Sequence, residues 1–329
     1  MVTQKDVAER AGVSTTTVSH VINETRFVSE ELRERVRSAM RQLDYKPHAV
    51  AQSLRRKRTY NIAVVVPDLA YPFLAEIARG IEDQGFQMGY NAILCASRGD
   101  VDKERACFDL VRTKRVDGLI LVATDRDTKP VRRLIGQGTP TVFCAREWQD
   151  TDADTVVADN PGAGQRATRH LLAQGHGRIG CIAGPAELWT SSQRMEGYRR
   201  ALEEVDVPFH DELVVHGDFR SRGGFDAMNV LLDLDQPPTA VFACNDLMAM
   251  GAICAASKRR LRIPEDIAII GCDDIALAAY TNPSLTTVAV PKHEMGSAAV
   301  EMLVARMEDA EKPAEKRILP VELVIRDSC

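Results

Sequence analysis

The N-terminal part of the chain has the hydrophobic periodicity of short helices. In the stretch STTTVSHVIN, the apolar residues Val18, Val21 and Ile22 are spaced i, i+3 and i+4, which places them on one face of a helix. The opposite face holds hydroxyl side chains and His20, and it has no Lys, Glu or Gln. Such a face suits a groove better than open water.

Helix start and stop signals around this stretch predict two further helices. Thr3 can cap a first helix with Asp6 at its third position, and Gly12 ends that helix at a tight turn. Ser14 caps the second helix, and a third helix begins after Ser29. The third helix directs four apolar residues inward: Leu32, Val36, Met40 and Leu43. Three short helices with a tight turn between the first two predict a helix-turn-helix.

A helix-turn-helix places the N-terminal part of its second helix in the major groove of DNA. Thr15, Thr16 and His20 then become hydrogen-bonding partners for base edges, and threonine methyl groups can contact thymine. The alternative at this point is a small helical cap with a polar surface.

The segment KPHAVAQSLRRKRT, residues 46–59, has the pattern of a short helix that ends in four basic residues. Pro47 is compatible with a helix start, but so short a helix is marginal in water. A segment that orders on meeting DNA, with Leu54 as an apolar wedge and Arg55 beside it, is a known way to bind the minor groove. A charged interdomain linker is the alternative.

From residue 60 onward, apolar runs alternate with helical segments. Such runs predict buried strands, and the alternation is typical of a parallel, doubly wound α/β sheet. The runs are YNIAVVVPD, NAILCAS, VDGLILVA, PTVFCA, RIGCIAG, TAVFAC and DIAIIG. They exceed what one sheet comfortably holds, so we predict two α/β subdomains, with a ligand bound at the loops that follow the strands.

Charge divides the chain at the same place. The net charge is −5, but residues 1–60 carry twelve Lys and Arg against seven Asp and Glu, a charge of +5, and residues 61–329 carry −10. A basic head on an acidic body is expected when only the head contacts a polyanion. No apolar run is long enough to span a membrane and the start lacks an apolar signal segment, so a soluble protein of the cytoplasm is expected.

The eight cysteines are scattered, with no CxxC pair and no metal-ligand spacing. Several stand in apolar runs, where they are expected to be small buried hydrophobic residues. They are Cys95, Cys107, Cys144, Cys181, Cys244, Cys254, Cys272 and Cys329. The chain also lacks HExxH, GxSxG and phosphate-loop patterns, so we expect no catalytic residue, no metal and no cofactor.

Several longer segments make the chain similar to the lactose-repressor (LacI/GalR) family. They are TQKDVAERAGVSTTTVSHVIN, RFVSEELRERV, LDYKPHAVAQSLR, CNDLMAMGA and IGCDDIALAAYTNPSLTTV. The chain most resembles the members that are similar to ribose and purine repressors, over essentially its whole length. The resemblance implies a homodimer whose paired hinge helices open a central CG step of a palindromic operator, and a body shaped like a periplasmic sugar-binding protein.

Pattern and resemblance together predict three parts. Residues 1–46 are a helix-turn-helix DNA-binding domain, residues 47–59 a hinge helix and linker, and residues 60–329 an effector-binding and dimerisation body. The resemblance places the crossovers between its two lobes near residues 160, 290 and 320. The predicted DNA contacts are Thr15, Thr16, Thr17, His20, Asn23, Ser29, Leu54 and Arg55.

Seven residues match the effector contacts of the family: Phe73, Trp189, Thr190, Arg194, Phe219, Asn245 and Asp273. Arg194 can bind hydroxyls or a carboxylate with its fork of donors, and Asp273 can accept hydrogen bonds from two vicinal hydroxyls. Aromatic rings can stack on a sugar or a base. Structural roles are the alternatives: a helix cap for Asp273, a hinge brace for Asn245 and core positions for the aromatic rings.

Departures from the ribose and purine patterns bear on the ligand. Four residues stand where ribose-type relatives tend to be polar: Tyr71, Ala123, Ala145 and Val290. Leu188 stands where the purine-binding pattern has an arginine. The expected effector is a pentose or a nucleoside, in a pocket less polar than a ribose site.

These observations predict a ligand-responsive, sequence-specific repressor of a sugar or nucleoside utilisation operon. Two other classes remain as alternatives. A sugar-binding or sugar-modifying cytoplasmic enzyme would bind no DNA, and a nucleoid-architectural protein would bind DNA widely and would not need a two-lobed body.

Overall fold

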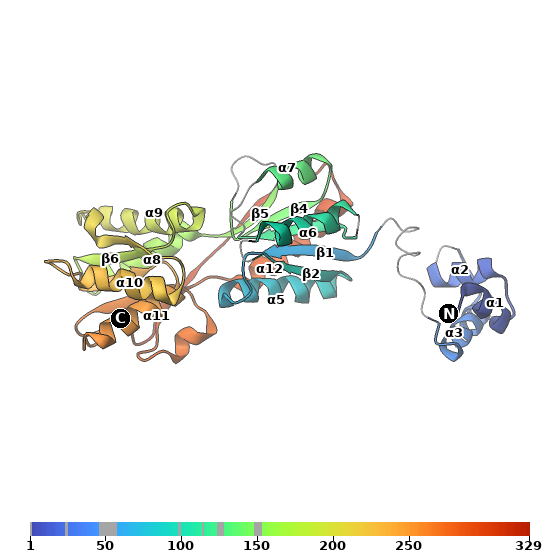
Figure 1. The fold of residues 1–329 in the computed structure, drawn as a ribbon, viewed down its shortest axis with the longest axis horizontal. Coiled ribbons are helices and arrows are strands. Elements are labelled where there is room, and N and C mark those ends of the chain that lie inside the picture. Colours follow the sequence, from blue (N-terminus) through green and yellow to red (C-terminus); the bar gives the residue numbers. More distant parts are fainter. Residues whose placement is uncertain are drawn as a thin grey trace. The chain divides into compact units, whose positions relative to one another are not determined.

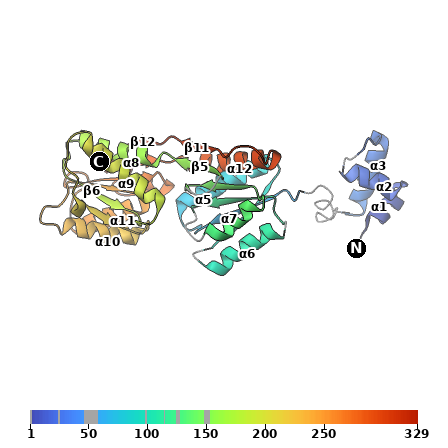
Figure 2. The ribbon, with the colours of Figure 1, turned by 90° about the horizontal axis from the view of Figure 1, so that it is seen from above.

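The chain folds into two compact units, residues 1–60 and residues 61–329, each with its own hydrophobic core (Figures 1 and 2). The residues described by the computed structural model are 2–23, 26–45, 58–97, 100–113, 115–123, 128–147 and 153–329.

The first unit contains α1 (Gln4–Ala11), α2 (Thr15–Asn23) and α3 (Glu30–Gln42). Its core is made mostly of alanine and valine side chains together with Tyr45, and Val7, Val18 and Val36 are fully buried. Val21 and Ile22 pack against this core. The apolar face of α2 therefore points inward, as its i, i+3, i+4 spacing predicts.

The predicted caps of the first two helices are present. The Thr3 hydroxyl accepts a hydrogen bond from the Asp6 backbone N–H, and the Asp6 carboxylate accepts one from the Thr3 N–H, which completes a capping box. Ser14 Oγ accepts a hydrogen bond from the Thr17 N–H at 3.0 Å and caps α2.

The turn between α1 and α2 is held from α3. Gly12 has φ 63°, a left-handed conformation that glycine adopts without steric cost. Arg35 Nη2 donates to the carbonyl oxygens of Ala11 at 2.7 Å and Gly12 at 3.2 Å, which satisfies the exposed end of α1. The local pattern and one long-range contact thus build the predicted helix-turn-helix.

The second unit contains two sheets in which parallel pairing dominates, so the predicted doubly wound α/β class is confirmed. The strand orders are β11-β5-β4-β3-β1-β2 and β12-β10-β9-β8-β6-β7. The first sheet consists of β1 (Asn61–Val66), β2 (Asn91–Ala96), β3 (Gly118–Val122), β4 (Thr141–Cys144), β5 (Asp154–Ala158) and β11 (Lys316–Leu319). The second consists of β6 (Ile179–Ala183), β7 (Val214–His216), β8 (Ala240–Ala243), β9 (Ala268–Asp273), β10 (Thr286–Ala289) and β12 (Glu322–Val324).

Helices cover both faces of the first sheet (Figure 2). They are α5 (Pro72–Gln87) and α12 (Lys292–Glu308) on one face, and α6 (Val101–Arg112) and α7 (Thr128–Gly136) on the other. Along β1, Ile62 and Val64 join the core under α5 and α12, whereas Ala63 and Val65 join the core under α6 and α7. Burial on both faces is why this strand is a continuous apolar run.

The second sheet is covered in the same way (Figure 1). Its helices are α8 (Asn160–Ala173), α9 (Trp189–Glu203), α10 (Ser221–Leu232) and α11 (Asp246–Lys258), with short 3-10 turns at Asp211–Leu213 and Ala276–Tyr280. The chain passes between the sheets after β5, after β10 and between β11 and β12. We call the part built on the first sheet the N-lobe and the part built on the second sheet the C-lobe.

Within each lobe, neighbouring helices pack so closely that glycines of one helix lie against the backbone of the other. A Cβ atom at Gly164 of α8 would lie 1.9 Å from the Arg194 carbonyl oxygen of α9, and one at Gly197 of α9 would lie 2.0 Å from the Pro161 carbonyl oxygen of α8. The same reciprocal contact occurs between α5 and α12 and between α10 and α11, at Gly80, Gly296, Gly224 and Gly251. The position of Arg194 therefore depends on these glycines.

The Gly197→Ala variant is expected to lower the free energy of unfolding of the body by about 1–3 kcal/mol, because the added methyl group must push α8 and α9 apart. Gly136→Ala is the matched control, since no atom lies within 4 Å of a Cβ there. It is expected to raise stability by up to ~1 kcal/mol through helix propensity. Urea unfolding measures both, and equal effects of the two variants would contradict the close packing.

Some cysteines differ from the prediction that those in apolar runs are small buried hydrophobic residues. Cys95 of β2 and Cys107 of α6 form a disulfide, with Cα atoms 6.1 Å apart. Cys254 is exposed. Pairing depends on how β2 and α6 dock, which a hydrophobic pattern does not encode. The expectation holds for Cys144, Cys181, Cys244 and Cys272, which are buried.

Candidate functional site

A cavity of 460 Å³ lies between the two lobes at the carboxyl ends of their strands. Loops after β1, β3, β4 and β5 line it from the N-lobe, and loops after β6, β7 and β8 together with the end of β9 line it from the C-lobe. Ligands of open α/β sheets bind at this edge. All seven predicted effector residues line the cavity: Phe73, Trp189, Thr190, Arg194, Phe219, Asn245 and Asp273. Their contact with a ligand stays a prediction.

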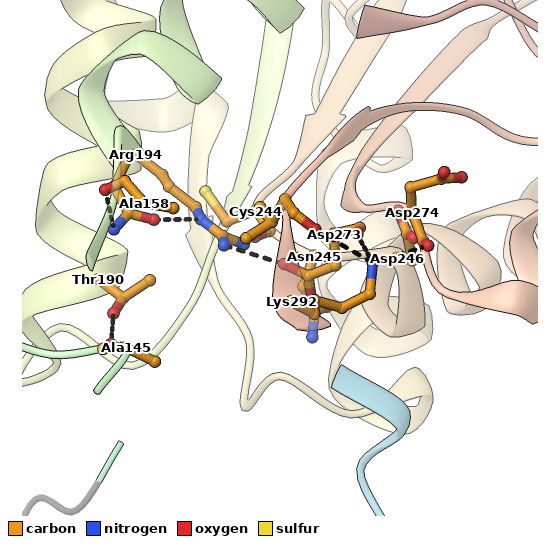
Figure 3. A network of polar contacts seen from close by, with 12 residues as sticks. Ala145, Ala158, Thr190, Arg194, Cys244, Asn245, Asp246, Asp273, Asp274 and Lys292 are labelled. Carbon is orange, nitrogen blue, oxygen red and sulfur yellow. Dashed lines mark hydrogen bonds and ion pairs between the residues drawn. The ribbon is translucent and has the colours of Figure 1, made fainter. Parts of the chain in front are cut away.

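Arg194 forms the closed end of the cavity with three partners (Figure 3). Its Nε donates to Asn160 Oδ1 at 3.0 Å, its Nη1 donates to the Cys244 carbonyl oxygen, and its Nη2 lies 2.9 Å from Asp273 Oδ1. The exposed fractions of Arg194 and Asp273 are 2% and 5%. The hydrogen bonds of Arg194 hold this buried ion pair in place.

The charge state of Asp273 reflects opposing influences. Burial raises the pKa of its carboxyl group above the ordinary value, and the neighbouring positive charges of Arg194 and Lys292 oppose this shift without cancelling it. We therefore expect a carboxylate held by two cations, able to accept hydrogen bonds from ligand hydroxyls.

The backbone that carries Asp273 has an unusual conformation. Asp273 has φ 120° and Asp274 has φ 52°, values that non-glycine residues rarely adopt and that cluster at functional sites. Lys292 Nζ donates to the carbonyl oxygens of both residues, at 2.5 Å and 2.9 Å, and Arg326 Nη2 donates to Asp274 Oδ1 at 2.7 Å. These three hydrogen bonds hold the backbone in this conformation and fix the position of Asp273.

Asp246 supports the same turn from α11. Its Oδ2 accepts from the Ile275 N–H at 2.8 Å and its Oδ1 accepts from the Thr287 hydroxyl. Asp246 is fully buried, and burial followed by the charge of Asp273 raises its pKa to about 8. Sequence reasoning missed Lys292 and Asp246, because their partners are far away in the chain.

Phe219 is held over the cavity by its surroundings. Its φ is 62°, and a Cβ atom on Gly184 would lie 2.2 Å from its ring, so the ring packs where glycine leaves room. Asn245 Nδ2 donates to the Phe219 carbonyl oxygen at 3.0 Å, and Asn245 Oδ1 accepts from the Met248 N–H at 2.8 Å. Asn245 therefore caps α11 and positions Phe219, a structural role beside the predicted ligand contact.

Polar contacts of Thr190 and Lys292 are among those that join the lobes beside the cavity. Thr190 Oγ1 of the C-lobe donates to the Ala145 carbonyl oxygen of the N-lobe at 3.4 Å (Figure 3). Lys292, at the start of α12, lies 3.6 Å from Glu76 of α5 while it donates to the turn at Asp273. Among the departures from the ribose and purine patterns, Tyr71, Ala123, Ala145 and Leu188 line the cavity, whereas Val290 is buried outside its lining.

In the first unit, the predicted DNA contacts gather on and beside α2. Thr15 and Thr16 are exposed, and His20 and Asn23 are partly buried on the same helix. The Thr17 hydroxyl lies 2.9 Å from Ser14 Oγ, and Asn23 Nδ2 donates to the Ser19 carbonyl oxygen, so both also stabilise the helix. Ser29 is exposed immediately before α3. The predicted hinge contacts Leu54 and Arg55 lie outside the described residues.

Two kinds of feature are absent from the residues that the structure describes. No helix in them is both long and apolar enough to cross a membrane. No group of three or more His, Cys, Asp or Glu side chains in them is arranged to hold a metal ion.

A helix-turn-helix unit followed by a two-lobed α/β body with a cavity between the lobes defines a class of ligand-binding DNA regulators. Comparison with known proteins agrees with this class. Residues 3–48 match the family "Bacterial regulatory proteins, lacI family", and residues 168–329 match "Periplasmic binding protein-like domain".

Known proteins are similar to this chain over nearly its whole length. The ribose operon repressor of Escherichia coli (strain K12) is 42% identical over 310 residues, 93% of each chain. The HTH-type transcriptional repressor PurR of Proteus mirabilis (strain HI4320) is 41% identical over all of this chain and 97% of that protein. The structure of the lac repressor dimer bound to operator and the anti-inducer ONPF has a TM-score of 0.89 at 29% identity, covering 99% of this chain and 98% of that one. The chain belongs to the lacI family of bacterial regulatory proteins and is a DNA-binding transcriptional regulator.

Proposed function

We propose that this protein is a repressor that binds a palindromic operator as a homodimer and changes its DNA affinity when a pentose or nucleoside binds between its lobes. The observation that carries the proposal is the buried Arg194–Asp273 pair at the closed end of an interlobe cavity, in the same chain as a helix-turn-helix. Relatives named as a ribose operon repressor and as PurR support an effector of this chemistry. The cavity binds and does not catalyse, and a bacterial regulator of chromosomal operators acts in the cytoplasm.

We assign one function to each of the three predicted domains. Residues 1–46 read the half-sites, residues 47–59 contact the centre of the operator, and residues 60–329 bind the effector and the second chain. Exposed large hydrophobic residues on the body are available for contact with the second chain. They are Leu94 on the edge strand β2, Leu277 and Tyr280 on a 3-10 turn, and Ile325 after β12.

The proposed switch is a change in lobe closure. Three chain crossings connect the lobes, and Thr190 and Lys292 make contacts that join them beside the cavity. A ligand that binds one degree of closure more tightly shifts the population toward it, and only this difference in affinity can drive the change at the DNA.

Selection of randomised DNA duplexes by the full chain tests the proposed DNA contacts. The unmodified protein should enrich a palindrome. His20→Ala should relax the preference at one symmetric position of each half-site, because one base contact contributes about 1–3 kcal/mol of discrimination. Leu54→Ala should flatten the preference at the centre, where an apolar wedge selects the steps that open most easily.

Each outcome of this selection has a separate meaning. If Leu54→Ala leaves the base preference at the centre of the palindrome unchanged, residues 47–59 act only as a linker. Failure of the unmodified protein to enrich any palindrome would contradict the proposed function itself.

A further inference from the structure

The open end of the cavity carries a group of polar residues that the predicted effector contacts do not include. We call it the mouth cluster: Asp68, Tyr71 and Arg146 of the N-lobe, and Asp218 and Arg220 of the C-lobe, all of which line the cavity. These residues are exposed or partly buried, in contrast to the buried closed end at Arg194 and Asp273. The cavity therefore has two polar ends.

Residues of the mouth cluster from the two lobes contact each other. The Arg220 guanidinium carbon lies 5.2 Å from the centroid of the Tyr71 ring, a cation–π contact between C-lobe and N-lobe. Burial raises the pKa of Tyr71; Arg220 lowers it, and Asp218 and Asp68 raise it, so all three charges lie close to this ring. Asp218 Oδ1 accepts a hydrogen bond from the backbone N–H of Arg220 at 2.8 Å, which fixes the Asp218 side chain to the loop that carries both residues.

The lining also contains large apolar residues, which we call the apolar section. It includes Phe73, Leu188, Trp189, Phe219 and Met295. The volume of 460 Å³ falls in the range of drug-sized ligand sites. A single sugar ring at the closed end would leave the apolar section and the mouth cluster to water.

The charges of the lining indicate what a ligand can carry. In the mouth cluster each lobe contributes one carboxylate and one guanidinium, and the closed end contributes Arg194 with Asp273. Among the residues that the structure describes, the lining carries three carboxylates and three guanidiniums, so it complements an uncharged ligand with both donors and acceptors. A phosphate at the open end would meet the carboxylates of Asp68 and Asp218 as well as the guanidiniums of Arg146 and Arg220, so no net positive charge of this cluster offsets the cost of removing the phosphate from water.

We propose that the effector is an uncharged glycoside of two rings (the fused rings of a purine counted as one), with a sugar at Arg194 and Asp273 and a second polar ring, a base or another sugar, hydrogen-bonded to the mouth cluster. This inference rests on the proposed function, since it takes the cavity as the effector site. It makes Arg220 and its neighbours determinants of ligand specificity.

Calorimetric titration of the full chain tests the inference with ribose, inosine, cytidine, cellobiose and inosine monophosphate. At least one neutral two-ring probe should bind about tenfold or more tightly than ribose, because it adds hydrogen bonds at the mouth. A nucleoside or cellobiose as the tightest probe distinguishes a base from a second sugar. Inosine monophosphate should bind more weakly than inosine.

A pair of matched variants then locates the second ring. Arg220→Met should weaken the tightest two-ring probe about tenfold. Arg222→Met should leave its affinity unchanged, because the Arg222 side chain is 79% exposed and pairs with Asp226 outside the cavity lining. Equal effects of the two variants would overturn the inference, as would ribose binding as tightly as every two-ring probe, or no binding by any two-ring probe. Failure of the proposed function would be seen separately, as DNA selection without a palindrome.

Discussion

Arg194→Met is expected to abolish the response to effector while the head retains its DNA binding. The substitution leaves the buried Asp273 carboxylate without its ion-pair partner and removes the donors to Asn160 Oδ1 and the Cys244 carbonyl oxygen. Removing one partner of a buried pair costs about 3–5 kcal/mol, so the body should also lose stability. Fluorescence anisotropy on the selected operator, with and without ligand, and urea unfolding measure the two effects.

Two further variants separate a ligand contact from a structural role. Arg200→Met is the control on the same helix, because the pair that Arg200 forms with Glu196 is largely exposed and contributes at most about 1 kcal/mol. Asp273→Asn keeps the shape of the closed end while it removes the negative charge, and it should also lose the response. A normal response of a folded Arg194→Met protein would show that Arg194 supports the fold and does not bind the ligand.

The free energy of unfolding of the body is expected to fall as the pH rises from about 4 to about 8. The pKa of an aspartate in an unfolded chain is about 3.9, whereas burial and then Asp273 raise the pKa of Asp246 to about 8 in the folded state. Between these values the folded protein holds a proton that the unfolded chain has released. The stabilisation is complete below about pH 4 and is lost as the pH rises through about 8, with a slope of up to about 1.4 kcal/mol per pH unit.

Asp246→Asn provides the comparison for this pH dependence. An asparagine can accept the hydrogen bond from the Ile275 N–H and donate to the Thr287 hydroxyl oxygen, so the geometry is kept and the titration is removed. Urea unfolding from pH 5 to pH 8 should show a shallower loss of stability for the variant, and greater stability than the unmodified protein at pH 8. Parallel curves for the two proteins would show that Asp246 is ionised in the folded state.

The parts of the fold that were predictable are those specified by local signals. The caps at Thr3 and Ser14 and the turn at Gly12 need no information from outside the first unit, and continuous apolar runs identify strands covered on both faces. The strand β5 escaped this pattern because it begins with Asp154, whose fully buried side chain pairs with Arg306 at 2.9 Å. The edge strands β11 and β12 are short and partly exposed, so they carry little hydrophobic signal.

The cavity could be located from the sequence because ligand residues follow strand ends, and the family resemblance selected among them. Asn160 follows β5 by the same rule and should have been included. Lys292, Asp246 and the mouth cluster were not predictable, because each acts through contacts made when distant segments and both lobes come together. The disulfide between Cys95 and Cys107 was missed for the same reason.

The central claim is that a small molecule between the lobes changes the affinity of the head for DNA. The most direct test measures one coupling in both directions, with the tightest-binding probe from the calorimetric titration. Operator affinity is measured with and without saturating probe, and probe affinity is measured with and without saturating operator. Linkage requires the two affinities to change by the same factor, typically about 5- to 150-fold. We predict equal factors in this range for the unmodified protein. A probe that binds without changing operator affinity would contradict the proposed coupling between the cavity and the DNA-binding head.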